Sequence, residues 1–275
     1  MEGPPHIQWL KDHGVALSTV AGQPVRVIEL QHQDNAEVLS AWAKHFREHY
    51  CLDSSLDQAR EGTGLSRKKY LEQFVFPDQC APGPSIRAGD FAEILVADFF
   101  EYLDGWRVPR TRYRYKGIPN ESTKGTDVLA FLLSKRTDLN RKVYSPRDVL
   151  MGIEVKAQFS GTKAEERLQE AVDNSVKDQF RRALSLNAMK MRLLAEGDLD
   201  NVKLVERFQN LADRPYQTKY TAAAFHCSCN YHRSAVTGVD ISNHPEAKNL
   251  ALLLVKGSAM MQLVNRLYEV AANEA

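Results

Sequence analysis

Residues 152–160 (GIEVKAQFS) constrain the fold most strongly, because they place two full charges inside an otherwise apolar stretch. Successive side chains of a β-strand point to opposite faces, so Glu154 and Lys156 share one face while Ile153 and Val155 occupy the other. Ionised groups near a core are costly unless they are paired, hydrogen-bonded or bound to a metal. The stretch predicts a strand with a matched acid and base on one face. The alternative is an edge strand whose charges are solvated.

The composition is that of a globular protein, with 43% hydrophobic and 26% charged residues among 275. A formal net charge of +1 excludes a polycation that binds nucleic acid through bulk charge alone. Four cysteines are too few for a disulfide scaffold in a chain of this length. No apolar run is long enough to span a bilayer, and the N-terminus does not resemble a signal peptide. We therefore expect a cytoplasmic protein without a membrane partner.

The order of elements predicts an α/β fold class, a mixed β-sheet flanked by helices. Helices are expected at residues 35–51, 89–103 and 259–275 and, as one long helix or a helical pair, at 160–198. Strands are expected at residues 23–31, 106–117, 125–135, 148–160, 220–232 and 249–258. The Pro- and Gly-rich residues 80–90 favour a boundary. We expect an N-terminal α/β region at 1–80, a possible docking site for a partner, and a core at 81–275.

Two adjacent expected strands bring a constellation of charged residues together. Asp127 opens one strand, and Glu154 and Lys156 lie within the next. Two carboxylates this close repel each other unless a proton or a cation is shared between them. Mg²⁺, or alternatively Mn²⁺, accepts oxygen ligands and leaves positions for water and phosphate. Lys156 would then position the attacking water and stabilise charge at phosphorus, so Asp127, Glu154 and Lys156 are the predicted catalytic residues.

This arrangement resembles the PD-(D/E)xK nuclease superfamily, in which an acid opens one strand and Glu/Asp-x-Lys lies on the next. The resemblance implies a restriction-endonuclease-like core. It also implies that a glutamate on the preceding helix completes the metal site, which makes Glu93 a predicted ligand with Asp127 and Glu154. The alternative for Glu93 is a capping contact, because a helix that starts after Asp90 places it at the third helical position.

A narrower resemblance rests on three segments in order, IRAGDFAEILVADFFEYL, KGTDVLAF and GIEVKAQFS. They are similar to the HamA nuclease subunit of the bacterial Hachiman anti-phage systems. The resemblance implies a HamB-like helicase partner and a role in destroying DNA during phage infection. The predicted function is therefore a Mg²⁺-dependent DNA nuclease. Its alternatives are a non-catalytic adaptor that docks a helicase or DNA, and a sequence-specific restriction-type endonuclease.

Residues 106–117 (WRVPRTRYRYKG) interleave cations with aromatic rings. Arginine neutralises phosphates, and aromatic rings stack on unpaired bases. Arg112, Arg114 and Lys116 are therefore predicted DNA contacts, and Gln158, on the face of Glu154 and Lys156, is a fourth. The alternatives are a solvated strand face for the cations and a merely polar neighbour for Gln158.

Overall fold

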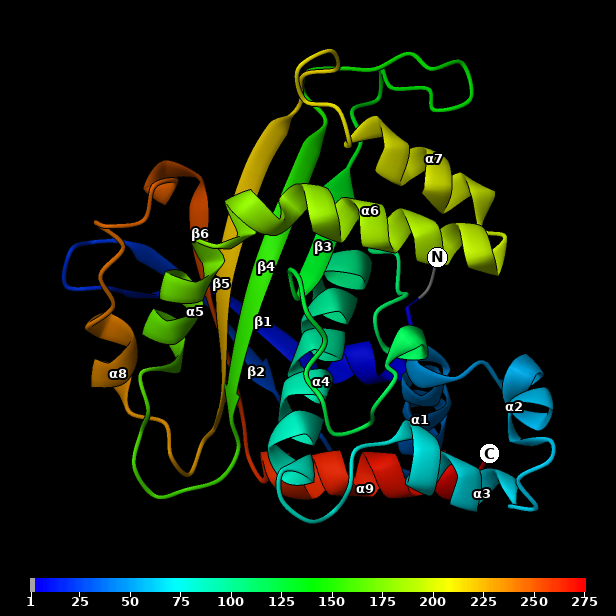
Figure 1. Ribbon diagram of the computed structural model, residues 1–275. Coiled ribbons are helices and arrows are strands. Elements are labelled where there is room, and N and C mark those ends of the chain that lie inside the picture. The colour runs from blue at the N-terminus through cyan, green and yellow to red at the C-terminus, as the bar shows by residue number, and fades with distance from the viewer. Residues whose placement is uncertain (1–2) are drawn as a thin grey trace.

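A six-stranded β-sheet runs through the computed structural model, which describes residues 3–275. Its strands are β1 (Leu10–Ser18), β2 (Pro24–Leu30), β3 (Val128–Leu132), β4 (Val149–Gln158), β5 (Gln217–Cys227) and β6 (Leu250–Gly257). They lie in the order β1-β2-β6-β5-β4-β3 (Figure 1). Strands β2, β6, β5 and β4 are parallel, and β1 and β3 pair antiparallel at the two edges. The predicted mixed sheet is confirmed.

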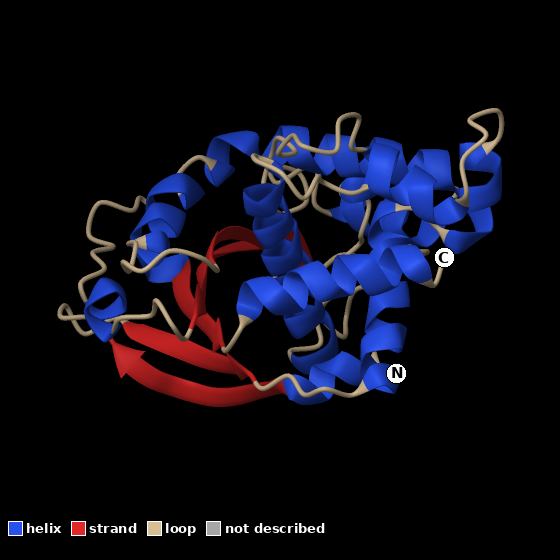
Figure 2. Cartoon of the chain, turned by 90° about the horizontal axis from the view of Figure 1, so that it is seen from below, coloured by secondary structure: helices blue, strands red, loops and turns tan. Residues whose placement is uncertain are grey.

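Helices cover both faces of this twisted sheet (Figure 2). They are α1 (Ala36–Tyr50), α2 (Asp53–Arg60), α3 (Arg67–Tyr70), α4 (Gly83–Asp98), α5 (Arg167–Ser175), α6 (Asp178–Glu196), α7 (Leu199–Arg207), α8 (Arg233–Thr237) and α9 (Met260–Asn273). Short 3₁₀ or π turns lie at Pro5–Trp9, Leu71–Val75, Phe99–Leu103, Tyr113–Tyr115 and Ala247–Asn249. Within residues 3–275, no helix is both long and apolar enough to cross a membrane.

Strand β4 divides its side chains between two packing layers. Ile153 and Val155 belong to the core formed with α1, α4 and α9, as the alternation along the strand predicted. Leu150 points the other way and packs with residues of α6 and α7. Because Gly152 and Glu154 follow Leu150 at the period of two, they lie on the α6 side of the sheet. The acid of the predicted site therefore faces α6, away from the largest core.

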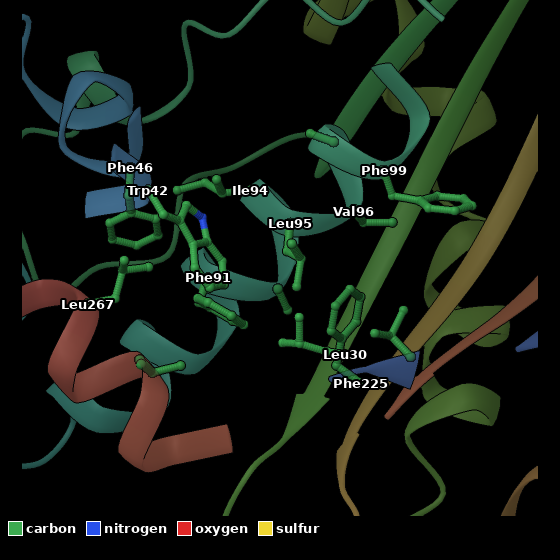
Figure 3. Close-up of a cluster of buried hydrophobic side chains, with 14 of the residues drawn as sticks. Leu30, Trp42, Phe46, Phe91, Ile94, Leu95, Val96, Phe99, Phe225 and Leu267 are labelled. Carbon is green, nitrogen blue, oxygen red and sulfur yellow. The ribbon is translucent and has the colours of Figure 1, made fainter. Parts of the chain in front are cut away.

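The largest core joins the N-terminal residues to the rest of the chain. Figure 3 shows Trp42 of α1 and Phe91 of α4 packed together, with Leu267 of α9 beside Phe46. Strand β2 also pairs with β6 in the same sheet. Residues 1–80 and 81–275 therefore share one sheet and one core, although the predicted boundary does coincide with the loop that precedes α4.

Two predicted local structures are wrong. Helix α4 begins at Gly83 with Pro84 in its first turn, so Asp90 lies inside the helix and is not its cap. This removes the capping alternative for Glu93. Residues 106–117 do not form a strand but an irregular segment with one bridge, between Arg107 and Phe131, and a 3₁₀ turn. Pro109 lacks the N–H that would continue a ladder of strand hydrogen bonds.

A buried ion pair connects α7 to the segments that precede β4 and β5. Arg207 Nε donates to Asp148 Oδ2 at 2.7 Å, and neither side chain is exposed. The remaining guanidinium nitrogens donate to the carbonyl oxygens of Ser145, Arg214 and Pro215. Asp148 directly precedes β4, so this contact holds the strand that carries Glu154 and Lys156.

Replacing Arg207 with methionine should lower the free energy of unfolding by about 3–5 kcal/mol, because the carboxylate of Asp148 would stay buried without its cation. Urea denaturation followed by circular dichroism measures the change. Lys203→Ala is the matched control on the same helix, since its ion pair with Asp200 is largely solvated and such pairs contribute about 0–1 kcal/mol. Equal effects for the two variants would contradict the assignment.

Candidate active site

Asp127 and Glu154 lie side by side where β3 begins. The pairing of β3 with β4 ends at Val128 and Ile153, and one further step of this register places Asp127 opposite Glu154. Gly125 leads into the strand with φ of +108°, a conformation that glycine adopts without steric cost. Asp127 Oδ2 accepts a hydrogen bond from the backbone N–H of Val155 at 2.9 Å. The structure therefore brings together the two strand carboxylates of the predicted site.

Lys156 contacts the acid two residues before it. Its Nζ donates to Glu154 Oε1 at 2.6 Å, and the lysine side chain is 24% exposed. Burial alone would lower the pKa of Lys156, but the Glu154 carboxylate raises it above its ordinary value. Lys156 is therefore a cation at neutral pH, suited to stabilise negative charge rather than to accept a proton.

Glu154 is buried and has one oxygen without a partner. Its residue exposure is 4%, and Oε2 accepts no hydrogen bond. Burial, reinforced by the nearby charge of Asp127, raises the pKa of Glu154. Strand β5 places Ala222 beside it, so no large side chain of that strand fills the space next to the carboxylate. Glu154 can therefore accept a cation at Oε2 without losing its contact to Lys156.

Glu93 approaches Asp127 from α4, on the opposite face of the sheet, and Arg112 lies between them. The guanidinium places Nε 3.1 Å from Glu93 Oε2 and Nη2 2.9 Å from Asp127 Oδ1. Tyr113 also donates its hydroxyl to Glu93 Oε2 at 2.6 Å. Burial raises the pKa of Glu93 to about 8, although the Arg112 charge opposes this shift. Glu93 is therefore linked to Asp127 through an arginine.

Asp178, in the first turn of α6, is a site residue that sequence reasoning missed. Its Oδ1 accepts a hydrogen bond from Thr126 Oγ1 at 3.0 Å, while Oδ2 is buried without a partner. Burial and the neighbouring charge of Glu154 raise the pKa of Asp178 to about 7. One signal in the sequence could have indicated it. Asp is favoured in the first turn of a helix, so Asp178 within residues 160–198 is a candidate start for a second helix.

A comparison with known protein families bears on the whole chain. A family model described as HamA matches residues 4–271. The chain belongs to the HamA family. This confirms the narrower resemblance, to HamA, and makes the chain a component of Hachiman anti-phage defence, a system that implies a partner. No curated protein matched the chain.

In this HamA-family chain, each predicted DNA contact has an intramolecular partner. Besides Arg112, which bridges two carboxylates, Arg114 Nη1 pairs with Glu196 at 2.6 Å and Lys116 Nζ pairs with Asp90 at 2.7 Å. Gln158 is buried and ties down the following loop through Lys163 O and the N–H of Glu165. Contact of these four residues with DNA stays a prediction, and the ion pairs reduce the charge that they offer to phosphate.

A pocket opens beside Glu93 and Asp127 of the candidate active site. It lies between α4, α6, the start of β3 and residues 108–113. Glu93, Arg112, Asp127 and Arg192 are among its lining residues. The pocket therefore gives access to Asp127, while Glu154 and Lys156 lie outside its lining.

A second cluster of potential metal ligands lies away from this site. Among the described residues, His6, His45 and Asp98 form the one group of three His, Cys, Asp or Glu side chains with ligand atoms within 4.8 Å of one another. Asp98 is fully buried and contacts a histidine through each oxygen, at 2.9 Å. Arg110 also donates to it at 2.5 Å. Its carboxylate is thus already neutralised by an arginine, and we assign the cluster a structural role.

Proposed function

We propose that this HamA-family chain is a Mg²⁺-dependent DNA nuclease that hydrolyses phosphodiester bonds, with Mn²⁺ as an alternative ion. The observation that supports this best is the adjacency of Asp127, Glu154 and Lys156 where β3 begins, with Glu154 Oε2 buried and unpartnered. This is the arrangement expected of a PD-(D/E)xK site, two acids and a lysine on neighbouring strands.

The residues fit a hard divalent cation. A buried carboxylate oxygen without a partner is costly, and an oxygen-seeking ion relieves that cost. Asp127 and Glu154 would hold the ion. Glu93 is the third predicted ligand, and in the structure it reaches Asp127 through Arg112. A divalent ion bound here would stabilise the charge that develops on the phosphate oxygens.

Lys156 supplies the second stabilising charge. Its ammonium group has hydrogen atoms to donate beyond the one used by Glu154. A water molecule attacks phosphorus, the bond to the leaving oxygen breaks, and the products are a phosphomonoester and a hydroxyl. Lys156 would orient this water and donate to a phosphate oxygen, and its cationic state supports both roles.

The partner in this proposal is a HamB-like helicase, as the family resemblance implies. A formal net charge of +1 supports it, because phosphate contacts supply most of the non-specific affinity for DNA. With many of its arginines already paired, the chain would bind DNA weakly at physiological salt. A helicase that holds the DNA would compensate by delivering the strand to Asp127 and Glu154.

The test compares degradation of linear and circular DNA by the wild type and by Glu154→Gln, each alone and with the helicase, in Mg²⁺, Mn²⁺ or EDTA. We expect cleavage that requires the metal and falls at least about a hundredfold in the variant, because glutamine removes the negative charge that would hold the ion. Glu170→Gln, at an exposed position of α5, is the matched control.

Other outcomes identify the alternatives. DNA binding by the wild type without metal-dependent cleavage in any lane would contradict the proposal and identify an adaptor. Discrete fragments from a defined substrate would identify a sequence-specific endonuclease, because general degradation leaves no fixed pattern.

A further inference from the structure

Asp178 lies against the same face of β4 as Glu154. A Cβ atom built on Gly152 would lie 3.7 Å from Asp178 Oδ2, and Gly152 precedes Glu154 by two residues along the strand. Side chains two residues apart in a strand are neighbours on one face. The carboxylate of Asp178 therefore lies next to that of Glu154, although 24 positions separate them in the sequence.

The two carboxylates are held in the same way. In each, one oxygen has a hydrogen-bond donor, Lys156 for Glu154 and Thr126 for Asp178. The other oxygen, Glu154 Oε2 or Asp178 Oδ2, is buried without a partner. Both residues are more than nine-tenths buried, at 4% and 2% exposure. Buried polar atoms are normally satisfied, so two unpartnered carboxylate oxygens on one face of β4 offer ligand atoms to a cation.

Glu93 is not placed to satisfy these oxygens. It extends from α4, which packs on the face of Ile153 and Val155, and its own Oε2 already pairs with Arg112 and Tyr113. On the α6 side, the charge of Arg181 favours the ionised forms of Glu154 and Asp178, which lowers their pKa values. Arg181 forms no ion pair among the described residues. Lys156 pairs with Glu154 Oε1 on this side, but no ion pair among the described residues reaches Glu154 Oε2 or Asp178 Oδ2.

The carboxylates of the site outnumber its ion-paired cations. Four carboxylates, of Glu93, Asp127, Glu154 and Asp178, face two ion-paired cations, Arg112 and Lys156. Burial and this crowding raise the pKa values of Glu93, Glu154 and Asp178, and a bound cation would favour their ionised forms.

We propose that Asp178 is a ligand of the divalent ion, which binds beside Glu154 Oε2 and Asp178 Oδ2 on the α6 side of the sheet. Glu93 is then a positioning residue that holds Arg112 against Asp127. The inference deepens the proposed function and rests on it for the identity of the ion. It adds a carboxylate from α6 that the strand motif does not contain.

The test measures metal binding without DNA. Isothermal titration calorimetry with Mn²⁺ compares the wild type, Asp178→Asn and the control Asp173→Asn, an exposed position on α5. Asparagine keeps an oxygen that accepts from Thr126 but removes the charge. We expect the dissociation constant of Asp178→Asn to rise at least about tenfold, because affinity depends on the charge of the ligands. The control should bind like the wild type.

Thermal melting with and without Mg²⁺ gives a second readout. Metal-free Asp178→Asn should melt at or above the wild-type temperature, since one of several crowded negative charges is gone. The upward shift that Mg²⁺ produces in the wild type should shrink. If Asp178→Asn does not fold, Thr126→Val tests the same idea, because it releases the Asp178 carboxylate while every charge remains. It should weaken Mn²⁺ binding severalfold.

The outcomes separate the two proposals. Wild-type Mn²⁺ affinity in Asp178→Asn, or in Thr126→Val where that variant replaces it, would overturn the assignment of Asp178 while leaving metal-dependent cleavage intact. Metal binding that depends on Asp178, without DNA cleavage by the wild type, would support the assignment and contradict the nuclease. A wild type that binds no divalent ion would overturn both.

Discussion

A Lys156→Met variant should retain the fold and lose DNA cleavage by about two to four orders of magnitude. Methionine keeps most of the apolar stem but removes the ammonium that contacts Glu154 Oε1 at 2.6 Å. The site would lose its nearest positive group for the attacking water and the phosphate. The measurement is the single-turnover rate of nucleotide release from linear DNA in Mg²⁺, with the helicase present.

The control for this prediction lies in the loop that follows β4. Lys163 is exposed, and its backbone oxygen accepts from Gln158, a contact that the side chain does not affect. Lys163→Met should therefore cleave at the wild-type rate. Lys156→Arg keeps the positive charge but changes the shape of the charged group. We expect a cleavage rate between those of the wild type and Lys156→Met, because a guanidinium cannot reproduce the point charge of an ammonium. Full cleavage by Lys156→Met would reduce Lys156 to a structural partner of Glu154.

The strand pair at the centre of the site could be predicted because its signal is local. The alternation of residues 148–160 predicted β4 and the shared face of Glu154 and Lys156. The structure confirms the strand and their contact. The mixed sheet followed from the order of elements for the same reason, since each element carries its own periodicity.

Asp178 could not be found in this way. Its link to Glu154 depends on the break between α5 and α6, which turns the chain so that the first turn of α6 meets β4 and β3. No periodicity along 160–198 specifies that turn, and the contact joins distant parts of the sequence.

Residues 106–117, the arginine-rich segment, could not be interpreted from composition alone. Its composition predicted a strand and DNA contacts, but residue types alone do not say whether a cation meets phosphate or a carboxylate of the same chain. Pro109 prevents the strand, and Arg110, Arg112 and Arg114 each pair with an acidic side chain. Tertiary structure decided the roles of these side chains.

Arg112→Met should lower the free energy of unfolding by about 3–5 kcal/mol in EDTA, the cost expected when a buried ion pair loses one partner. Arg112 is the cation between Glu93 and Asp127, and its side chain is 13% exposed. Burial would lower the pKa of Arg112, but the charges of Glu93 and Asp127 raise it, so the guanidinium stays charged. Urea denaturation gives the change. Arg107→Ala, an exposed position in the same segment, should cost less than about 1 kcal/mol.

A double-mutant cycle identifies the source of this cost. If it comes from uncompensated carboxylates, Glu93→Gln should be less destabilising in the Arg112→Met background than in the wild type, because it removes one of the two stranded charges. Mg²⁺ should restore part of the stability of Arg112→Met, since an ion held by Asp127 neutralises the other. Additive effects of the two substitutions would show that Glu93 and Arg112 act independently. Glu93 would then have no role in positioning the arginine against Asp127.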